Sequence, residues 1–421
     1  STQSPCSLRT PCRLADRTFY TTSDAAEALR QSVAARTRGS QQPAMVRLQT
    51  IRIWALPLDF FDADDDAARF KMLDAVTEDS APRSGLRTPP PMPVLHQLAA
   101  IATCSLVAVP LLLPIAWVAM LLTGRYMTLV ISLVVVALCT LHPISHQLAY
   151  RRNRVGLLWA RYFGFEIVVD RDQSPSAAKA VTAATLAPSK RDGDTTGPDG
   201  VGLVNLACPH GVINYGASIF TFFSRWLTGA DQVTAVADAV KVAPGLRHFA
   251  APLWPVSASR GSMDRLLSAA QTIGLVPDGI GGIFDSAGFV PWGRDALSLG
   301  KKRGLMRLLL KHGATAMPGY FIGTLQLFSV SQDPFGVMRT LSRQLRVSLF
   351  LFHGRFGLPI PRRGPLTAVV AFVPAPCAPI AEPSDEQVEA HHKRVYGALV
   401  EAYDAAKAVV GLPEAARLTI S

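Results

Sequence analysis

The sequence has little charge for its length, and its cysteines form no pattern typical of a metal site. Charged residues make up 17% and hydrophobic residues 49% of the 421 residues, whereas soluble domains carry about 25% charged residues. This balance excludes an intrinsically disordered chain, which needs low hydrophobicity and high charge. The six cysteines include no C-x-x-C pair, so we expect no metal, no disulfide framework and a reducing compartment.

Two signatures of common enzyme classes are also missing. No G-x-S-x-G is present, which argues against a soluble hydrolase with a nucleophile elbow. The glycine-rich run Pro277–Asp285 lacks the G-x-G-x-x-G spacing of a dinucleotide site, and we expect no bound cofactor. Its glycines, which follow a predicted strand, favour a tight turn with exposed backbone N–H groups.

The charge that is present is mostly positive. The formal net charge is +11, and a chain that is both apolar and basic favours a membrane partner, with the positive charge facing anionic lipid or an anionic substrate. Nucleic acid is the competing partner. We expect none, because the basic residues are scattered and no aromatic-rich binding motif accompanies them.

Residues 1–45 are rich in arginine, serine, threonine and alanine and contain few acidic residues. That composition fits either a disordered leader or a transit peptide. Residues 46–97 are mixed in character and are interpreted as a cytosolic N-terminal segment.

Two uncharged runs follow, Leu98–Leu122 of 25 residues and Tyr126–Leu141 of 16. A membrane span needs about 20 apolar residues, so the first run suffices and the second fits a thin or re-entrant pass. Pro110 and Pro114 are expected to kink the first helix. We therefore predict a membrane helical hairpin over residues 98–148, with both arginine-bearing flanks in the cytosol. The alternative is a buried helical pair of a soluble core.

The rest of the chain alternates between strand and helix patterns, which predicts an α/β layered domain over residues 149–421. Trp159–Asp170 fits a helix that runs into a strand, and residues 171–200 are expected to form a mobile loop. Predicted helices are Ile213–Leu227, Ser262–Ile273, Leu305–His312 and Ser384–Val410, the last with a capping box from Ser384 to Gln387. Predicted strands are Val201–Ala207, Gly274–Pro277, Ala314–Phe321, Leu345–Phe352 and Leu366–Val373.

The most pointed candidate site is Cys208-Pro209-His210-Gly211. It follows a predicted buried strand and precedes a helix, so it lies at the functional edge of an α/β sheet. His210 beside a helix N-terminus can take a proton from a hydroxyl group, and nearby N–H groups can stabilise an oxyanion. A structural histidine is the alternative, because so short a motif arises by chance.

A second candidate is the basic block Lys301-Lys302-Arg303-Gly304, which continues to Arg307 and Lys311. On a helix, Arg303, Arg307 and Lys311 fall at i, i+4 and i+8 and share one face. Such a face can bind the phosphates of a nucleotide-bearing donor or of lipid. A solvated or membrane-facing helix is the alternative.

In their order along residues 95–415, these blocks resemble the type 2 diacylglycerol acyltransferase family, which includes monoacylglycerol and wax-alcohol acyltransferases. The order makes the resemblance more specific than any single motif. The matching segments are the hydrophobic hairpin, Trp159–Phe163, Cys208–Gly211 at the place of the signature H-P-H-G, Pro255–Arg260, Gly281-Gly282 with Asp285, Lys302–Gly313, Pro318–Gly323, Phe352–Arg355 and Pro361–Leu366.

The chain departs from the family pattern at named positions. Cys208 replaces the first histidine of the signature, and Thr324 replaces a glutamate. Related glycerolipid acyltransferases carry H-x-x-x-x-D, but Tyr215 holds the place of that aspartate here. No carboxylate therefore orients His210 locally, and Asp278 and Asp285 are candidates by their place near the glycines.

The resemblance implies a glycerolipid-acyltransferase-like domain with a central mixed sheet, preceded by the hairpin. It implies transfer of an acyl group from acyl-CoA to the hydroxyl of diacylglycerol, with His210 as general base and N–H groups near Gly211 holding the oxyanion. Gly281, Gly282, Asp285 and the basic block are substrate-site candidates, the block through charge alone. A nucleophilic Cys208 is disfavoured, because no neighbour beyond His210 would stabilise its thiolate.

Two alternatives stay open. The acceptor can be monoacylglycerol, a long-chain alcohol or a sterol, or the chain can be a catalytically weak lipid-binding scaffold. The family implies the endoplasmic reticulum membrane and lipid droplets, with a plastid membrane as the alternative. The sequence is compatible with a homo-oligomer but does not set the oligomeric state.

Overall fold

A computed structural model of the chain describes residues 47–421 except 64–65, 142–153, 171–193, 198–199, 286–290, 298, 300–301, 332, 334, 346–349 and 377. The chain divides into two units, Ser1–Met45 and Val46–Ser421, and the description concerns the second. The predicted leader and most of the predicted mobile loop therefore lie outside the described residues.

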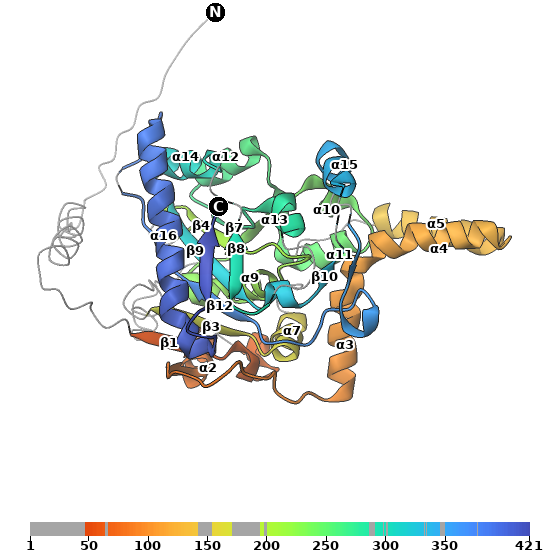
Figure 1. Cartoon of the computed structure of the whole chain (residues 1–421), viewed down its shortest axis with the longest axis horizontal. Coiled ribbons are helices and arrows are strands. Elements are labelled where there is room, and N and C mark those ends of the chain that lie inside the picture. Colours follow the sequence, from red (N-terminus) through yellow and green to blue (C-terminus); the bar gives the residue numbers. More distant parts are fainter. Residues whose placement is uncertain are drawn as a thin grey trace, which may run out of the picture. The chain divides into compact units, whose positions relative to one another are not determined.

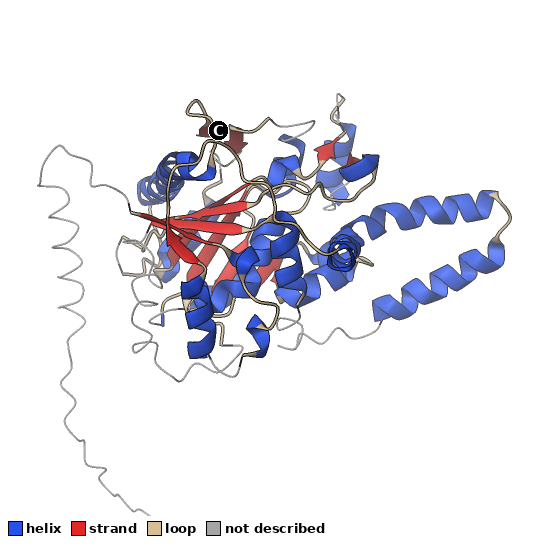
Figure 2. Ribbon diagram, turned by 90° about the horizontal axis from the view of Figure 1, so that it is seen from below, coloured by secondary structure: helices blue, strands red, loops and turns tan. Residues whose placement is uncertain are grey.

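A large mixed sheet forms the centre of the described unit (Figures 1 and 2). Its strand order is β2-β1-β3-β12-β9-β4-β7-β5-β6. The bounds are β1 Leu48–Ile51, β2 Thr77–Asp79, β3 Glu166–Asp170, β4 Leu203–Cys208, β5 Val233–Val236, β6 Pro255–Ser257, β7 Thr272–Leu275, β9 Thr315–Ile322 and β12 Thr367–Val370. Smaller pairs are β10 (Ser329–Val330) with β11 (Phe352–His353) and β8 (Arg294–Leu297) with β13 (Arg417–Ile420).

Parallel pairing dominates the half of the sheet that carries the candidate site. β4 runs parallel to β7 and β9, and β5 runs parallel to β6 and β7. β12 is antiparallel to β9 but parallel to β3, and β1 is antiparallel to both β2 and β3. The expected α/β fold with a central mixed sheet is confirmed.

Helices cover both faces of the sheet, so its central strands are buried on both sides. In β4, Val204 and Leu206 join the core cluster of α12 (Arg260–Ser268), α14 (Gly304–His312) and α16 (Asp385–Val410). Leu203 and Ala207 point the other way, into the cluster of α7 (Val155–Phe163) and α9 (Tyr215–Thr228). This arrangement explains why the strand pattern is a continuous apolar run rather than an alternating one.

Several predicted elements are confirmed. α7 runs into β3, α14 ends at a left-handed Gly313, and α16 begins at Ser384, whose side chain and that of Gln387 form the reciprocal capping box. Strands β4, β7 and β9 lie within two residues of their predicted bounds, and β12 starts one residue later and ends three residues earlier than predicted.

Three predictions need correction. The helix expected over Ser262–Ile273 ends at Ser268, because Ala270 takes a positive φ of 51° and Thr272 starts β7. The glycine run folds as a short helix, α13 (Gly279–Asp285), rather than a tight turn. The strand expected over Leu345–Phe352 is wrong at its start, where Leu345 ends α15 (Val337–Leu345), and at its end only Phe352 lies in a strand, the two-residue β11; residues 346–349 lie outside the described residues.

The first apolar run is not one helix. It contributes to α3 (Val94–Cys104), a 3-10 turn at Ser105–Ala108 and α4 (Val109–Leu122). Proline is favoured in the first turn of a helix, and Pro110 lies in the first turn of α4, whereas Pro114 lies inside α4. Among the described residues, no single helix has the length and apolar composition of a membrane span. The helices Val94–Ala108 and Leu112–Leu122 satisfy these two criteria when taken as a pair, and the pair is bent by 76°.

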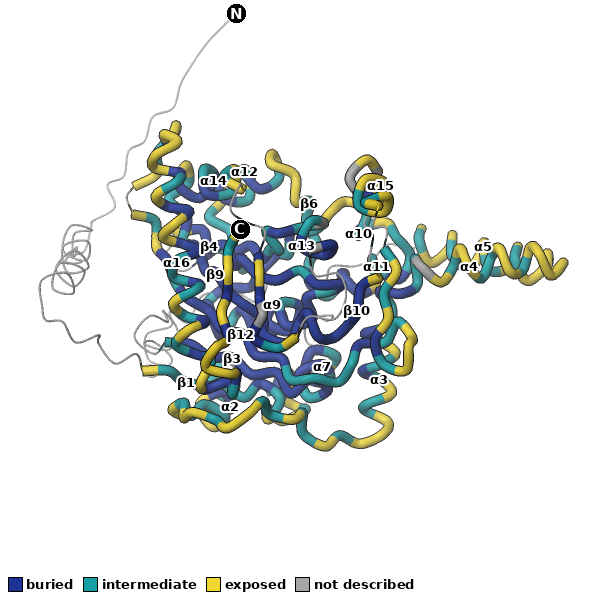
Figure 3. The backbone as a smooth tube through the Cα atoms, viewed as in Figure 1, coloured by how far each residue is buried: buried dark blue, intermediate teal, exposed yellow. Residues whose placement is uncertain are grey.

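The helices α4 and α5 (Tyr126–Leu141) lie side by side and expose most of their apolar side chains (Figure 3). By contrast α3 packs on α7, where Trp159 Nε1 donates to Thr103 Oγ1 at 2.9 Å. Tyr215 at the start of α9 also donates to the Cys104 carbonyl at 2.8 Å. The base of the hairpin is thus fixed to the helix that follows the candidate catalytic loop.

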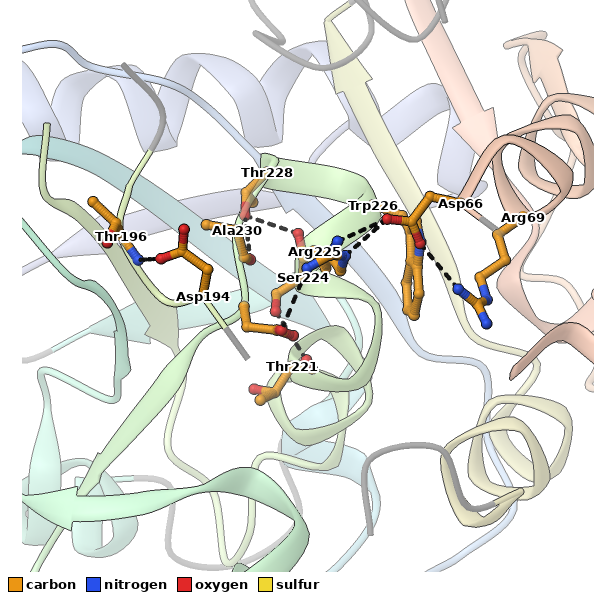
Figure 4. A network of polar contacts seen from close by, with 11 residues as sticks. Asp66, Arg69, Asp194, Thr196, Thr221, Ser224, Arg225, Trp226, Thr228 and Ala230 are labelled. Carbon is orange, nitrogen blue, oxygen red and sulfur yellow. Dashed lines mark hydrogen bonds and ion pairs between the residues drawn. The ribbon is translucent and has the colours of Figure 1, made fainter. Parts of the chain in front are cut away.

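The N-terminal segment is joined to the sheet domain by ion pairs (Figure 4). Asp66, at the start of α2 (Asp66–Ala75), accepts hydrogen bonds from Arg225 at 2.8 and 3.0 Å, and from Trp226 and Arg69 at 3.0 Å each. Burial alone would raise the pKa of the Asp66 carboxyl, but the hydrogen bonds from Arg225 and Trp226 outweigh it and lower the pKa. This contribution to stability is present above the unfolded pKa and is lost as the pH falls through the folded pKa.

We expect Asp66→Asn to lower the free energy of unfolding by about 1 kcal/mol, which corresponds to a Tm shift of about 2 °C. The loss should shrink as the pH falls below 4. Asp62→Asn is the matched control, because the Asp62–Arg154 pair at 2.9 Å is exposed on both sides. Equal melting temperatures for the two variants at neutral pH would contradict the assigned role of Asp66.

Candidate active site

Two neighbouring parallel strands bring the candidate residues to one edge of the sheet. β4 ends at Cys208 and continues into Pro209 and His210, while β7 ends at Leu275 and continues to Asp278. Because the two strands pair in parallel, their carboxyl ends meet. The loop after β4 and the loop after β7 therefore face each other.

Two contacts position His210, one through its backbone N–H and one through its ring. Its N–H donates to Asp278 Oδ2 at 2.8 Å, and its ring Nδ1 lies 2.9 Å from the Gly211 carbonyl oxygen. A carbonyl oxygen only accepts, so the contact assigns the proton to Nδ1 and leaves Nε2 with the lone pair. The residue is half-buried, which leaves it within reach of a substrate.

Asp278 is a buried carboxylate beside this histidine, only 1% exposed. Burial raises the pKa of its carboxyl. The interaction with His210, including the hydrogen bond from the His210 backbone N–H, and the positive charge of Lys302 offset part of that rise. Gly282 makes room for it, since a Cβ at Gly282 would lie 2.1 Å from Asp278 Oδ2. The charge of Asp278 is thereby kept in a tight, desolvated position next to His210.

The end of the loop is fixed by Asn214 and Gly211. Asn214 caps α9: its Oδ1 accepts from the Ala217 N–H at 2.8 Å, and its Nδ2 donates to the Pro209 carbonyl at 2.9 Å. Gly211 has a positive φ of 54°, and a Cβ there would lie 3.1 Å from Thr324 Cγ2. Thr324, which replaces the glutamate of the resembled family, is buried against this loop.

Cys208 is buried in the core on the α16 side of the sheet. Burial raises the pKa of its thiol well above the ordinary value, and the negative charge of Asp278 raises it further, while Lys302 lowers it. The thiolate is therefore disfavoured, which argues against a nucleophilic role. The Cys208–Pro209 peptide bond is cis.

The basic block divides into one residue at the site and three that pair elsewhere. Lys302 Nζ donates to the carbonyl oxygens of Pro277 and Asp278, at 3.1 Å for Pro277. The other pairs are Arg303 with Glu389, Arg307 with Asp385 and Lys311 with Asp264. These pairs join α14 to α16 and α12, so their predicted contact with substrate phosphates would have to compete with ion pairs inside the protein.

The remaining candidates lie near the site in the chain. Gly281 and Gly282 belong to α13, and Gly304 is the first residue of α14. Asp285 is the last residue of α13, but its side chain lies outside the described part of the structure. The structure places the other candidate carboxylate, Asp278, against the backbone of His210.

A family model described as diacylglycerol acyltransferase matches residues 204–421, which is more than half of the chain and begins within β4. The chain belongs to the diacylglycerol acyltransferase family. It is accordingly an acyltransferase, and the matched region contains the whole His210–Asp278 arrangement.

The acyltransferase is similar to three curated relatives. Diacylglycerol O-acyltransferase 2-like protein 6 of Bos taurus is 28% identical over 232 residues, 50% of this chain and 68% of that protein. Acyl-CoA wax alcohol acyltransferase 2 of Mus musculus is 29% identical over 51% of this chain and 69% of that protein. Diacylglycerol O-acyltransferase 2 of Homo sapiens is 27% identical over 51% of this chain and 58% of that protein.

Among solved structures, the acyltransferase is similar to the 1-acyl-sn-glycerophosphate acyltransferase PlsC of Thermotoga maritima at 15% identity. The match covers 69% of this chain and 95% of that one, with a TM-score of 0.29. At that score the likeness supports no argument about the site.

Sequence reasoning gave Asn214 no role, and it offered Asp278 only as one of two carboxylates near the glycines. Both carry a recognisable signal. Asp278 follows a strand that neighbours the strand before His210, and an asparagine just before a helical pattern is a preferred N-cap. The missing information was the pairing of β4 with β7, because it decides which loop faces His210.

The two neighbouring glycines give a stability test of the acyltransferase. Gly282→Ala should lower the Tm by about 2–10 °C, because its Cβ collides with Asp278 Oδ2 and overpacks the site. Gly281→Ala should leave the Tm unchanged or higher, since nothing lies within 4 Å of a Cβ there. Thermal melting of the pair checks this, and equal losses would show that Asp278 is not packed as described. Acyl transfer by stable Gly281→Ala then tests the predicted substrate contact.

Proposed function

We propose that this acyltransferase transfers a fatty acyl group from acyl-CoA to the hydroxyl of diacylglycerol and forms triacylglycerol. The observation that carries the proposal is the arrangement of His210. Its Nδ1 lies on the Gly211 carbonyl, its backbone N–H is bonded to a buried carboxylate, and the residue is partly open to solvent. An imidazole held in this way is suited to take a proton from an alcohol.

The reaction balances without a covalent enzyme intermediate. The acceptor hydroxyl gives its proton to His210 Nε2 as its oxygen bonds to the thioester carbonyl carbon. Backbone N–H groups near Gly211 are the proposed donors to the resulting oxyanion. The C–S bond then breaks, and the CoA thiolate leaves with the proton returned by His210. We assign the positioning of His210 to Asp278, whose negative charge also favours the imidazolium that forms.

The diacylglycerol acceptor is the least constrained part of the proposal. The names of the relatives cover diacylglycerol, acyl-CoA wax alcohol and 2-acylglycerol transferases, so monoacylglycerol, a long-chain alcohol or a sterol are the alternatives. A weak lipid-binding scaffold would keep the fold and lose the chemistry. The shared part, an acyl-CoA donor and a lipid hydroxyl, suits a fold of the glycerolipid-acyltransferase type.

Membrane attachment is proposed through α4 and α5. Helix α4 has 14 residues and α5 has 16. At 1.5 Å per residue their lengths are about 21 and 24 Å, whereas the hydrocarbon core of a bilayer is about 30 Å thick. Their exposed apolar surface suits a re-entrant hairpin that enters the bilayer and returns. We expect the endoplasmic reticulum membrane and lipid droplets, with both flanks cytosolic.

The first test is acyl transfer by membranes that lack endogenous storage-lipid acyltransferases, with labelled oleoyl-CoA and a panel of acceptors. His210→Ala should lose about 10²–10⁴-fold in rate. Asp278→Asn should lose at least about tenfold, because the amide keeps an acceptor for the His210 N–H but removes the charge. Its Tm should be equal or higher, since a buried carboxyl with a raised pKa costs stability at neutral pH.

The outcomes separate the hypotheses. Triacylglycerol from the wild type alone supports the proposal, and product on another acceptor changes the substrate while keeping the chemistry. Full activity of Asp278→Asn would show that only its hydrogen-bond acceptor matters. No product from wild type and variant, at equal amounts in the membrane, would favour the scaffold.

A second test concerns the donor. Lys302→Ala should raise KM for acyl-CoA about fivefold with a smaller change in kcat, because Lys302 is the cation of the basic block that contacts the Asp278 loop. Arg307→Ala is the matched control. It breaks the pair with Asp385, so it should lower the Tm and leave the KM for acyl-CoA nearly unchanged. Initial rates over a range of acyl-CoA concentrations check both, and an unchanged KM for Lys302→Ala would remove it from the donor site.

A further inference from the structure

Large exposed hydrophobic side chains lie outside the hairpin as well. In the part of the chain that the structure describes, and apart from α3–α5 and Val201, they fall in three places. These are Val242 at the end of α10 (Asp238–Val242), the segment Phe335–Leu341, and the segment Leu351–Leu358. Phe335 and Phe356 are 89% and 78% exposed. A patch confined to a few segments needs a partner more than scattered single residues do.

Helix α15 carries several of these exposed hydrophobic side chains on one face. Val337, Met338 and Leu341 stand at i, i+1 and i+4, which places them on one face of the helix. That face is exposed, with Phe335 directly before it. An amphipathic helix of a globular protein ordinarily turns its apolar face to the core, so this one presents it to a partner.

Contacts connect these places to the neighbourhood of the hairpin or of the site. Helix α10, which carries Val242, packs on the next helix, and the ring of Phe350, next to Leu351, lies 6.3 Å from that of Phe284 in α13. The turn before α11 (Leu246–Ala250) touches the base of α4: a Cβ at Gly245 would lie 2.5 Å from Val109 Cβ. Arg247 also donates to the Cys139 carbonyl in α5 at 3.3 Å. Helix α15 contacts α13, where Arg339 lies over Phe284 at 5.5 Å. Figure 1 shows α10, α11 and α15 at the end of the domain from which α4 and α5 extend.

The charge of these segments complements an anionic surface. The segments Phe335–Leu341 and Leu351–Leu358 contain Arg339 and Arg355 and no acidic residue. One of the arginines, Arg355, lies against the exposed ring of Phe356 at 4.8 Å. Arginine next to exposed aromatic and aliphatic side chains is the composition of surfaces that enter the headgroup region of a bilayer.

We propose that Val242, Phe335–Leu341 and Leu351–Leu358 form an interfacial surface that docks on a bilayer containing anionic lipid. It is separate from the hairpin and holds the Asp278 side of the active site against the membrane, because α15 packs on α13, which follows Asp278. The inference rests on the proposed function only in that the acceptor is a membrane lipid.

The test places an environment-sensitive fluorescent amino acid in the full chain at position 335, 356 or 201. Val201 is the matched control, since it is exposed and apolar but precedes β4, at the opposite edge of the sheet from His210. The vesicles are phosphatidylcholine with and without phosphatidylglycerol, and carry a shallow spin-labelled quencher. We expect at least twofold stronger quenching at positions 335 and 356 than at 201, increased by phosphatidylglycerol and reduced by salt.

Quenching at 335 no greater than at 201 would overturn the proposal. So would a blue shift at 335 that depends on protein concentration without lipid, since it would assign the surface to a second copy of the chain. Acyl transfer to a dispersed short-chain acceptor is measured in parallel. Activity without quenching removes only the interfacial surface, whereas quenching without activity removes only the proposed function.

Discussion

The site depends on one hydrogen bond, from the backbone N–H of His210 to the carboxylate of Asp278. A buried carboxylate is costly unless it is hydrogen-bonded and has positive charge nearby, and here the hydrogen bond from the His210 N–H is joined by the positive charge of Lys302. Gly282 must stay without a side chain for the carboxylate to fit. The parallel pairing of β4 and β7 brings the two loops together, so the sheet order itself is a requirement of the site.

The parts of this arrangement that depend on local chemistry could be predicted from the sequence. The capping box of Ser384 and Gln387, the glycine that ends α14 and the buried run of β4 all follow from neighbours in the chain. The partner of His210 did not follow, because Asp278 is 68 residues away and its loop is brought beside His210 by the pairing of β4 with β7. The helical spacing of the basic residues in α14 is visible in the sequence. Their acidic partners are not, because these partners lie on α16 and α12.

The hairpin shows the same division between local and distant causes. Composition identified its apolar length, and Pro110 marks where α4 starts. That α3 belongs to the domain depends on distant contacts, such as the hydrogen bond from Tyr215 to Cys104. Few residues separate this contact from the candidate site. Tyr215 follows the capping residue Asn214, whose side chain donates to the Pro209 carbonyl. A short series of hydrogen bonds therefore joins the base of the hairpin to the loop that carries His210.

The departure at Cys208 is explained by the direction in which this residue points. Its side chain packs into the core between the sheet and α16, near Tyr320 and Tyr396, while the chain turns His210 toward Asp278 two residues later. A histidine at position 208 would bring two ring nitrogens that need hydrogen-bond partners in this core. A cysteine needs none, because it behaves as a small apolar side chain when its thiol is protonated. Cys208 therefore belongs to the core beneath the site, whereas His210 makes the contacts with Asp278 and Gly211.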